Sequence, residues 1–369
     1  MFVDQVSERD WLYLLSSVPG LGRVKLRAMY EMAGSFKEAM KKWDSLSHEL
    51  KLSASIKKEG NQLRKEAVAL KILRERISNG IQYVCFLDED FPDQLRHIPD
   101  PPLVLFYRGE LQLLQKPAIG VVGSRKPTPY GRASCSYLVK ELVQAGLVII
   151  SGLAYGIDGE AHETTLKNNG KTVGVLGCGI DQVYPPRHRA LYEKIATFGL
   201  LLSEYPPGTP PVPGLFPERN RIISGLSLGI IVVEAAEKSG SLITADCALE
   251  QGKDVFAIPG PIFSSLSMGP HNLIKQGAKL VTSGFDVLDE LGYPLVPKTG
   301  PRHHDYLNQN LLDKEELAII DIVTHEGIHV DDLLAQLDPD MRKSLHQVLF
   351  RLEAKGALVA LAGGYFAKR

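Results

Sequence analysis

The stretch Ala118–Arg132, AIGVVGSRKPTPYGR, carries the residue types of an anion-binding turn. An apolar run over residues 119–122 predicts a buried parallel strand that ends at Gly123-Ser124-Arg125, and a proline-rich turn and a predicted helix follow. Backbone N–H groups at a helix N-terminus attract negative charge, and the guanidinium adds donors that suit a phosphate. The Walker A spacing and the full dinucleotide fingerprint are both absent. The stretch alone leaves open whether it is a phosphate site or an ordinary turn with a surface arginine.

Small and polar residues also follow most of the other predicted strands. The carboxyl ends of parallel strands meet at one edge of a sheet, and ligands bind beyond that edge near the switch in strand order. Small residues let a ligand approach the backbone, while hydroxyls and amides at helix starts donate hydrogen bonds to phosphate. Several such turns on one edge predict a binding site more strongly than one turn does. The residues that we expect there are Gly123, Ser124, Arg125, Gly152, Arg219, Asn220, Arg221, Ser239, Gly240, Ser241 and Thr244.

Motifs of metal, cofactor and hydrolase chemistry are absent from the sequence. It contains no H-E-x-x-H, no G-x-S-x-G and no acid at the end of the second predicted strand, where NAD-binding proteins hold a ribose. The four cysteines form no C-x-x-C pair, which argues against a zinc site and a disulfide framework. We therefore predict no metal and no cofactor. Asp158 and His162 could do acid–base work, but their place in the first turns of a helix favours capping and packing.

The elements that must position these residues alternate between apolar strands and helices. This alternation predicts an α/β fold with a doubly wound, Rossmann-like parallel sheet of about seven strands within residues 81–292. Short strands joined by acidic and proline-rich turns are expected before it, in residues 81–111. The seven strands are expected at residues 118–122, 148–150, 172–176, 200–203, 229–234, 254–258 and 279–282.

Residues 1–80 are predicted to form a helical domain of the SAM-like or helix-hairpin-helix-like kind. They hold 15 Lys and Arg against 10 Asp and Glu, whereas the whole chain has a formal net charge of -1. This imbalance permits nucleic-acid binding without requiring it. Arg23, Lys25 and Arg27 follow a Pro-Gly-Leu-Gly turn, where a helix-hairpin-helix would contact a phosphate. A lone hairpin is weak evidence, so a helical hairpin with a solvated basic face is the favoured interpretation.

The C-terminal part predicts a linker and a small third domain. Residues 293–308 hold three Pro, one Gly and two His, which is typical of a linker. Residues 309–369 predict three helices and a two-stranded hairpin, which is the plan of a winged helix. The third helix is basic and the second acidic, which favours a protein contact or a regulatory role over base-specific readout of duplex DNA. With no signal peptide and no apolar run of about 18 residues, we expect a cytoplasmic protein without a membrane partner.

The central region carries a series of motifs in the order found in one bacterial family. They are GSR, SGLAYGIDGEAH, GVLGCGIDQVYP, LLSEYPPG, FPERNRIISGLS, VVEAAEKSGSLITADCALEQG and VFAIPG. Over residues 80–292 the chain closely resembles the DNA-processing protein A family (DprA or Smf). The flanking segments resemble its three-domain members more loosely, the last one their winged-helix (DML1-like) domain. The resemblance implies an extended Rossmann fold, a homodimer and a protein without enzymatic activity that binds single-stranded DNA. Such proteins protect incoming strands during natural transformation and load RecA recombinase onto them.

The family's functional positions are carried over where the motifs match. The resemblance implies phosphate binding by the GSR motif (residues 123–125) and pocket roles for Gly152, residues 219–221 and residues 239–244. Arg187 stands where the family often has a basic residue after the Tyr-Pro turn.

The resemblance also implies a dimer face and shows two departures. His271, Ile274 and Leu280 match the stretch that forms the family's dimer face. At the positions of Tyr155 and His188 the family commonly has a basic residue and an asparagine, so the resemblance leaves the local DNA contacts of these two positions open.

Physical reasoning from the residues leads to the same expectation. A groove for single strands neutralises phosphates and offers aromatic rings on which bases stack. Tyr155, Tyr184 and Phe216 are candidate platforms, each of which could equally belong to the core. Three to four neutralised phosphates per subunit predict a log–log salt slope of about -2 to -3. The arginines expected to supply the charge are Arg125, Arg187, Arg219 and Arg221.

Two other functions stay open on the sequence. Lysine-decarboxylase-like phosphoribohydrolases also place Gly-rich strand ends around a phosphate, and they carry P-G-G-x-G-T-x-x-E with a catalytic glutamate. The segment SGSLITADCALEQG occupies a comparable place here, but Glu250 lies later than that glutamate would. A mononucleotide sensor without catalysis is the third possibility. Nucleotide hydrolysis that is lost on changing Glu234 or Glu250 would favour the enzyme.

Overall fold

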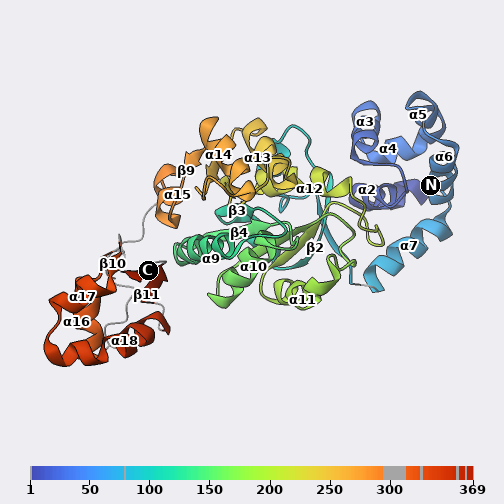
Figure 1. Cartoon of the computed structure of the whole chain (residues 1–369). Helices are drawn as coiled ribbons and strands as arrows, with labels where there is room; N and C mark the ends of the chain where they lie inside the picture. The colour runs from blue at the N-terminus through green and yellow to red at the C-terminus, as the bar shows by residue number, and fades with distance from the viewer. Residues whose placement is uncertain are drawn as a thin grey trace. The chain divides into compact units, whose positions relative to one another are not determined.

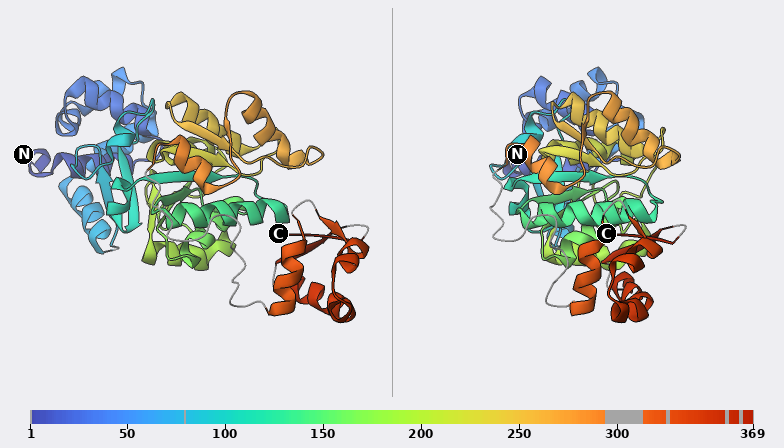
Figure 2. Two further views of the ribbon diagram at one scale, coloured as in Figure 1. Left: turned by 90° about the vertical axis from the view of Figure 1, so that its left-hand side faces the viewer. Right: turned by 60° about the vertical axis from the view of Figure 1, so that its left-hand side comes forward.

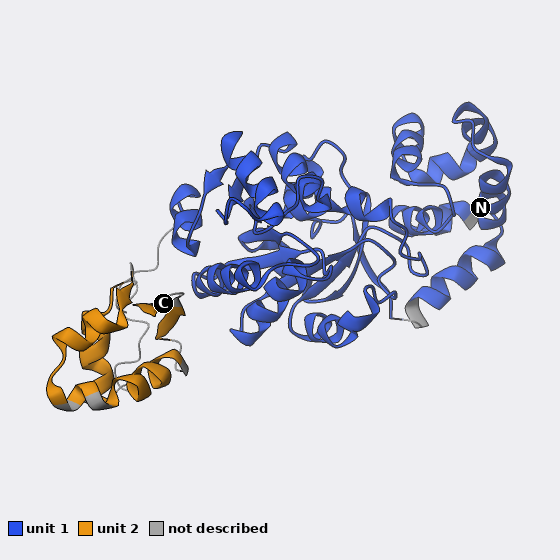
Figure 3. Cartoon of the chain, viewed as in Figure 1, with its two compact units in different colours: residues 1–295 blue, residues 296–369 orange. Residues whose placement is uncertain are grey.

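The computed structural model describes residues 2–78, 80–293, 313–324, 327–354, 357–361 and 364–368. The chain separates into two compact units, residues 1–295 and residues 296–369 (Figure 3). The boundary at residue 295 lies close to the start of the predicted linker at residue 293. The rest of that linker lies outside the described residues.

A mostly parallel sheet forms the centre of the first unit (Figure 1). Among the described residues it has nine strands in the order β1-β2-β6-β5-β4-β3-β7-β8-β9. The strands from β3 to β9 pair in parallel, whereas β1 with β2 and β2 with β6 are antiparallel. The parallel strands are therefore confirmed at the predicted places, and the short strands expected before them form an antiparallel edge. The bounds are β1 (Gln82–Cys85), β2 (Val104–Gly109), β3 (Ala118–Val122), β4 (Val148–Ser151), β5 (Thr172–Leu176), β6 (Leu200–Ser203), β7 (Gly229–Val232), β8 (Asp254–Ala257) and β9 (Lys279–Leu280).

The order of the strands reverses beside β3. The chain runs outward from β3 through β4 and β5 to β6, returns to the other side of β3, and continues through β7 and β8 to β9. β3 and β7 are direct neighbours, with Gly120 opposite Ile230. Ligands of open α/β sheets bind at such a reversal, outside the carboxyl ends of the strands. The segments that follow β3 and β7 therefore meet at the expected binding edge.

Continuous apolar runs explain why the central strands are buried on both faces. β3, β4, β5, β6 and β7 are buried along their whole length, as is usual for parallel strands covered by helices. Helices α9, α10, α11 and α15 cover one face, and α12, α13 and α14 cover the other (Figures 1 and 2). Their bounds are α9 (Pro129–Gln144), α10 (Ile157–Lys167), α11 (Arg189–Phe198), α12 (Leu215–Leu226), α13 (Gly240–Glu250), α14 (Met268–Lys275) and α15 (Gly284–Glu290). The short elements between them are α8 (Asp93–Arg96) and the 3-10 turns η1 (Leu111–Gln115), η2 (Pro186–His188) and η3 (Ser265–Ser267).

The N-terminal helices share a hydrophobic core with the β1 end of the sheet (Figures 1 and 2). Trp11 and Trp43 lie in the same buried cluster as Phe106 of β2, and the ring of Tyr13 stacks on Tyr83 at 5.3 Å. The predicted helices are present, but residues 1–80 do not form a compact unit apart from the sheet. The helices are α1 (Phe2–Gln5), α2 (Glu8–Ser16), α3 (Arg23–Ala33), α4 (Phe36–Lys41), α5 (Trp43–Glu49), α6 (Ala54–Leu63) and α7 (Glu66–Ser78).

The basic residues after the Pro-Gly-Leu-Gly turn take part in this docking. Arg23 donates to the carboxylates of Asp100 at 2.7 Å and Glu218 at 2.8 Å, and Arg27 donates to the backbone carbonyl of Pro101. The favoured interpretation of a solvated basic face is therefore wrong for these two arginines. They attach α3 to the loop before β2 and to α12.

The second unit contains the elements expected for residues 309–369. Its described residues form three helices and a small antiparallel sheet in the order β10-β12-β11. Ile319, Leu333 and Leu349 lie in its buried core. The winged-helix assignment itself stays a prediction, and the turn of the predicted hairpin lies partly outside the described residues. The bounds are α16 (Lys314–Ile322), β10 (Ile328–His329), α17 (Val330–Gln336), α18 (Pro339–Ala354), β11 (Leu358–Leu361) and β12 (Tyr365–Lys368).

His162 shows how tightly α10 packs on the sheet. Its side chain is fully buried, and Nδ1 lies 2.6 Å from the hydroxyl of Thr172. That hydroxyl donates its hydrogen to the carbonyl of Ile149 at 2.7 Å, so the ring nitrogen must be the donor in the first bond. Burial lowers the pKa of His162 to about 3. The histidine therefore packs as a neutral ring, which is the outcome that its place in the sequence favoured.

This burial predicts that the first unit loses stability as the pH falls below neutrality. An unfolded histidine takes up a proton with a pKa near 6.5, whereas folded His162 stays neutral down to about pH 3. Its contribution to stability is present above about pH 6.5 and is lost as the pH falls toward 3. The free energy of unfolding of the wild type should fall between pH 7 and pH 5. In His162→Gln this fall should be smaller by about 2 kcal/mol. Urea unfolding measures this, because Trp11 and Trp43 both report on the first unit.

A matched control is His97→Gln, because His97 is exposed at the surface. This control should keep the pH dependence of the wild type. An unchanged pH dependence in His162→Gln would contradict the assignment of His162 as a buried neutral ring.

Candidate nucleic-acid interface

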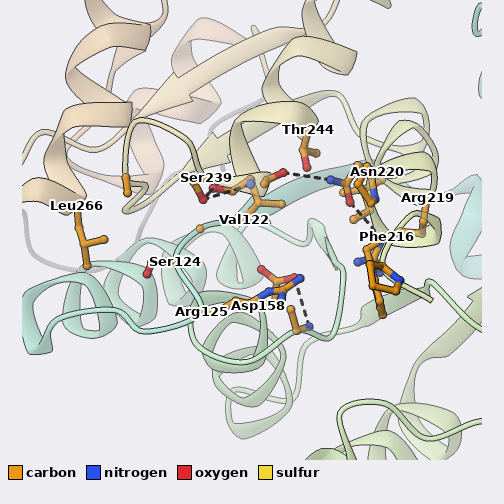
Figure 4. Close-up of a pocket in the computed structure, with 18 residues that line it drawn as sticks. Val122, Ser124, Arg125, Asp158, Phe216, Arg219, Asn220, Ser239, Thr244 and Leu266 are labelled. Carbon is orange, nitrogen blue, oxygen red and sulfur yellow. Dashed lines mark hydrogen bonds between the residues drawn. The ribbon is translucent and has the colours of Figure 1, made fainter. Parts of the chain in front are cut away.

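A pocket of about 420 Å³ lies at the reversal point, beyond the ends of β3 and β7 (Figure 4). It is lined by nine of the residues that the sequence placed at this edge. Gly152, Arg187 and Arg221 do not line it. The predicted residues that do are Gly123, Ser124, Arg125, Arg219, Asn220, Ser239, Gly240, Ser241 and Thr244.

The first turn of α13 forms one wall of the pocket. Ser239 caps the helix, accepting from the amide of Ser241 at 3.4 Å, and the two hydroxyl oxygens lie 2.8 Å apart. Gly240 and buried Thr244 complete this wall. An N-terminus of this kind presents backbone N–H groups and a positive dipole end to the pocket. It can therefore hold an anionic group such as a phosphate.

The loop after β3 is fixed in place by Glu234. The amide of Ser124 donates to the carbonyl of Glu234 at 2.6 Å, and the carboxylate of Glu234 accepts from the amide and hydroxyl of Thr128 at 2.8 and 2.6 Å. Thr128 in turn caps α9. The carboxylate of Glu234 is thus engaged in holding the turn, and it does not line the pocket.

Helix α12 reaches into the pocket from the opposite side with Phe216, Arg219 and Asn220. The Arg219 guanidinium is buried and donates to the carbonyls of Gly152 at 2.8 Å and of Val175. Burial lowers the pKa of Arg219, and the nearby carboxylate of Asp158 opposes that shift. The guanidinium is therefore largely occupied by the protein's own carbonyls.

Two glycines make room for these side chains of α12. A Cβ on Gly152 would lie 2.5 Å from Arg219 Nη2 and 2.8 Å from a carboxylate oxygen of Asp158. A Cβ on Gly177 would lie 2.6 Å from the ring of Phe216. Gly152 therefore acts on the pocket by leaving space behind its wall, although it does not line the pocket itself.

Arg125 is the exposed cation of the pocket. Its guanidinium lies 6.0 Å from the centre of the Phe216 ring. Within the described part of the chain, no carboxylate lies within ion-pair distance of it and no hydrogen bond engages its side chain. A planar guanidinium beside an aromatic face can bind a phosphate and leave the ring to a base.

Arg221 takes a different part from the one expected. Its side chain is 9% exposed and forms two hydrogen bonds of 2.8 Å to the carboxylate of Glu204, which is 8% exposed. It also pairs with Asp100 at 3.2 Å, and Asp100 pairs with Arg23. Burial raises the pKa of Glu204, and Arg221 opposes the shift. The Arg221 side chain faces away from the pocket on α12. Its charge is therefore neutralised by carboxylates inside the protein.

The aromatic candidates lie beside the pocket in two pairs. Tyr184 packs against Phe216 with ring centres 5.2 Å apart, and Tyr155 meets His188 edge to face at 5.0 Å. Tyr184 and Tyr155 are 37% and 38% exposed, so both rings retain accessible faces. Arg187 is exposed, three residues after Tyr184.

Asp158 lines the pocket, whereas the sequence left acid–base work open for it and favoured capping and packing. Its carboxylate accepts from the amides of Gly152 at 3.1 Å and Ala154 at 3.4 Å, and burial raises its pKa. It thereby holds the loop after β4 in shape, where Leu153 has a φ of 55°. In the sequence, the acidic first turn of the helix that became α10 was the only feature that pointed to Asp158. The remaining lining residues carry no polar side chain and were not predicted at the site; they are Val122, Ala154, Pro213, Pro217, Ile223, Ala236 and Leu266.

The predicted dimer residues lie at the far end of the sheet from β1. His271 Nε2 bonds to the carbonyl of Gly260 at 3.0 Å, Ile274 packs against the core, and Leu280 is 45% exposed. β9, which contains Leu280, is the last strand in the sheet order.

The described residues contain neither a metal-binding cluster nor a membrane-spanning helix. No group of three His, Cys, Asp or Glu side chains among them is arranged to hold a metal ion. No described helix has the length and apolar character that a membrane crossing requires.

Known proteins match this chain over the sheet and the pocket. Residues 82–292 match the family described as DNA recombination-mediator protein A. The chain is 47% identical over 232 residues to DNA processing protein DprA of Bacillus subtilis (strain 168), which covers 63% of this chain and 78% of that protein. It is 51% identical over 207 residues to DNA processing protein DprA of Streptococcus pneumoniae (strain ATCC BAA-255 / R6), covering 56% and 73%.

Two solved structures resemble the fold. The structure of DNA processing protein A from Streptococcus pneumoniae matches with a TM-score of 0.61 at 38% identity, over 77% of this chain and 98% of that one. DNA processing protein A from Helicobacter pylori, described with a single-stranded DNA binding mode, matches with a TM-score of 0.52 at 33% identity, over 57% and 95%.

The family match spans more than half of the chain and contains every residue that lines the pocket. The resemblance to DprA and Smf proteins is confirmed by these relatives. The chain belongs to the DNA recombination-mediator protein A family.

Proposed function

We propose that this chain binds single-stranded DNA in the pocket beyond the carboxyl ends of β3 and β7. The observation that carries the proposal is the exposed guanidinium of Arg125, which lies beside the Phe216 ring and close to the first turn of α13. The guanidinium and the helix N-terminus would hold phosphates, and the ring would stack on a base. The relative from Helicobacter pylori, described by its single-stranded DNA binding mode, supports this choice of ligand.

The wider role that we propose follows the family. The chain would protect single strands during recombination and natural transformation and would load RecA recombinase onto them. It would act as a homodimer through His271, Ile274 and Leu280. The position of Leu280 supports this, because an edge strand leaves backbone groups free to pair with another chain.

We also propose that the pocket carries no catalysis. The glutamates that an enzyme of the phosphoribohydrolase kind would use lie elsewhere: Glu234 holds Thr128, and Glu250 is exposed at the end of α13. Asp158 is the acid that lines the pocket, and its carboxylate is engaged by backbone amides. A group that is already held in this way is poorly placed to take a proton from a substrate.

Arg125→Ala tests the proposed function. Removing one charge-assisted phosphate contact should weaken binding of a thymidine oligonucleotide about 10- to 100-fold. Of the four arginines predicted to contact DNA, Arg219 and Arg221 are engaged inside the protein, and Arg125 and Arg187 are exposed. The wild-type log–log salt slope should therefore be about -1.4 per subunit and that of the variant about -0.7. Fluorescence anisotropy of a labelled strand at several salt concentrations measures both quantities.

Arg74→Ala is the matched control, because Arg74 is an exposed arginine on α7 and does not line the pocket. It should bind like the wild type, and a duplex of the same sequence should bind more weakly than the single strand. Equal affinities for Arg125→Ala and the wild type would contradict the proposal.

Gly152→Ala should displace Arg219 from the wall of the pocket, although residue 152 does not line the pocket itself. The added methyl group would meet the guanidinium of Arg219 at 2.5 Å and would force it off the carbonyls that it holds. We expect a loss of about 1–3 kcal/mol in stability and at least a tenfold loss in affinity for the oligonucleotide. Urea unfolding and anisotropy measure the two effects.

Gly22→Ala serves as its control, since a Cβ there meets nothing within 4 Å. If Gly152→Ala binds DNA as tightly as this control, the position of Arg219 does not matter for the pocket.

Arg221→Met should affect stability more than DNA contact. It leaves the buried carboxylate of Glu204 without its main partner, and breaking a buried pair costs about 3–5 kcal/mol. The double variant Arg221→Met with Glu204→Gln should recover much of that loss, because no unpaired charge remains. The salt slope of DNA binding should stay at the wild-type value in the double variant. A reduced slope there would instead place Arg221 on the DNA.

A further inference from the structure

The loop between β8 and η3 exposes two large apolar side chains. Ile262 is 74% exposed and Phe263 is 96% exposed, and the loop residues 259–266 carry no charge. Phe263 is the most exposed large apolar side chain in the described part of the chain. Two adjacent apolar side chains exposed to this extent form a small apolar patch, and such patches can mark a binding site.

Hydrogen bonds hold this loop in one shape. The hydroxyl of Tyr130 donates to the carbonyl of Pro259 at 2.6 Å, His271 Nε2 bonds to the carbonyl of Gly260 at 3.0 Å, and the amide of Ser264 donates to the carbonyl of Pro261 at 3.0 Å. Two prolines restrict the backbone further. The backbone that carries the exposed Phe263 ring is therefore held in one conformation.

The 3-10 turn η3, into which this loop leads, forms one end of the pocket. Leu266 lines the pocket, and its carbonyl accepts from the amide of Ala235 at 2.8 Å. Figure 4 shows Leu266 at one end of the pocket and Phe216 at the opposite end. A strand that entered the pocket at Phe216 and crossed its length would leave it at Leu266. Phe263 lies three residues before Leu266, in the braced loop that leads into η3.

We infer that Phe263, with Ile262 beside it, is a stacking platform for a nucleobase of the strand as it leaves the pocket. This inference rests on the proposed function. The pocket supplies the charge that holds phosphates, while the loop supplies an uncharged aromatic face, and bases stack on such faces without regard to sequence. The loop thus extends the site by one nucleotide beyond the phosphate pocket.

The main experiment compares wild type, Phe263→Ala and the control Phe198→Ala, whose ring is 60% exposed on α11 and does not line the pocket. Anisotropy is measured with a labelled thymidine 12-mer and with an abasic 12-mer of the same backbone. We expect Phe263→Ala to bind the thymidine 12-mer about tenfold more weakly than the wild type and the control. The abasic 12-mer should bind the three proteins equally, because it has no base to stack.

Phe263→Trp provides a direct readout of stacking. Trp11 and Trp43 are fully buried, so a new tryptophan at residue 263 would dominate the response to the strand. We expect the thymidine 12-mer to quench its fluorescence and the abasic 12-mer to leave it unchanged. Tight binding without quenching would overturn the inference.

Other outcomes separate the inference from the proposed function. If the wild type fails to bind the 12-mer, the proposed function fails and the inference fails with it. If the wild type binds but Phe263→Ala binds equally well, only the inference is overturned. Sedimentation of the same proteins tests a second copy as the occupant. A Phe263→Ala protein that loses both its dimer and its affinity would show that the loop contacts another chain instead.

Discussion

The structure depends on helix α12 being held from two sides by two arginines that stand two positions apart, Arg219 and Arg221. Arg219 enters the pocket wall and is fixed by the carbonyls of Gly152 and Val175, while Arg221 points the other way into the carboxylates of Glu204 and Asp100. One turn of helix therefore connects the binding edge of the sheet to the ion pairs that also hold α3. A buried charge without its partner is costly, so these contacts fix the helix along its axis and about it. The position of Phe216 and Asn220 at the pocket follows from this constraint.

The same constraint changes how the charges of the site are understood. The sequence predicts four arginines at the binding edge of the sheet. Two of them, Arg219 and Arg221, bind carbonyl or carboxylate groups of the protein itself. Electrostatic attraction of a strand then depends on Arg125, Arg187 and the first turn of α13. This is a modest charge for a nucleic-acid site, and aromatic faces such as Phe216 and Tyr184 would supply much of the remaining affinity.

The fold could be predicted from the sequence because its parallel strands are continuous apolar runs separated by helices of regular pattern. The GSR turn and the serine-rich start of α13 were also recognisable, since a phosphate site needs small residues and amides at those places. The use of Arg221 could not be predicted, because both of its partners, Glu204 and Asp100, are distant in sequence. The core that the N-terminal helices share with β2 could not be predicted for a similar reason, because Trp11 and Trp43 join one buried cluster with Phe106 only in the folded chain. The exposure of Phe263 is likewise a property of the folded loop.

Hydrogen exchange of backbone amides, measured by mass spectrometry with and without a thymidine oligonucleotide, tests the central claim most directly. A strand held by the pocket should slow exchange in residues 123–126 and in the first turn of α13, residues 239–242, while α7 and the far ends of α10 and α11 stay unchanged. Protection confined to the N-terminal helices or to residues 313–368, with the pocket amides unaffected by saturating oligonucleotide, would contradict the assignment of this pocket as the site that binds DNA.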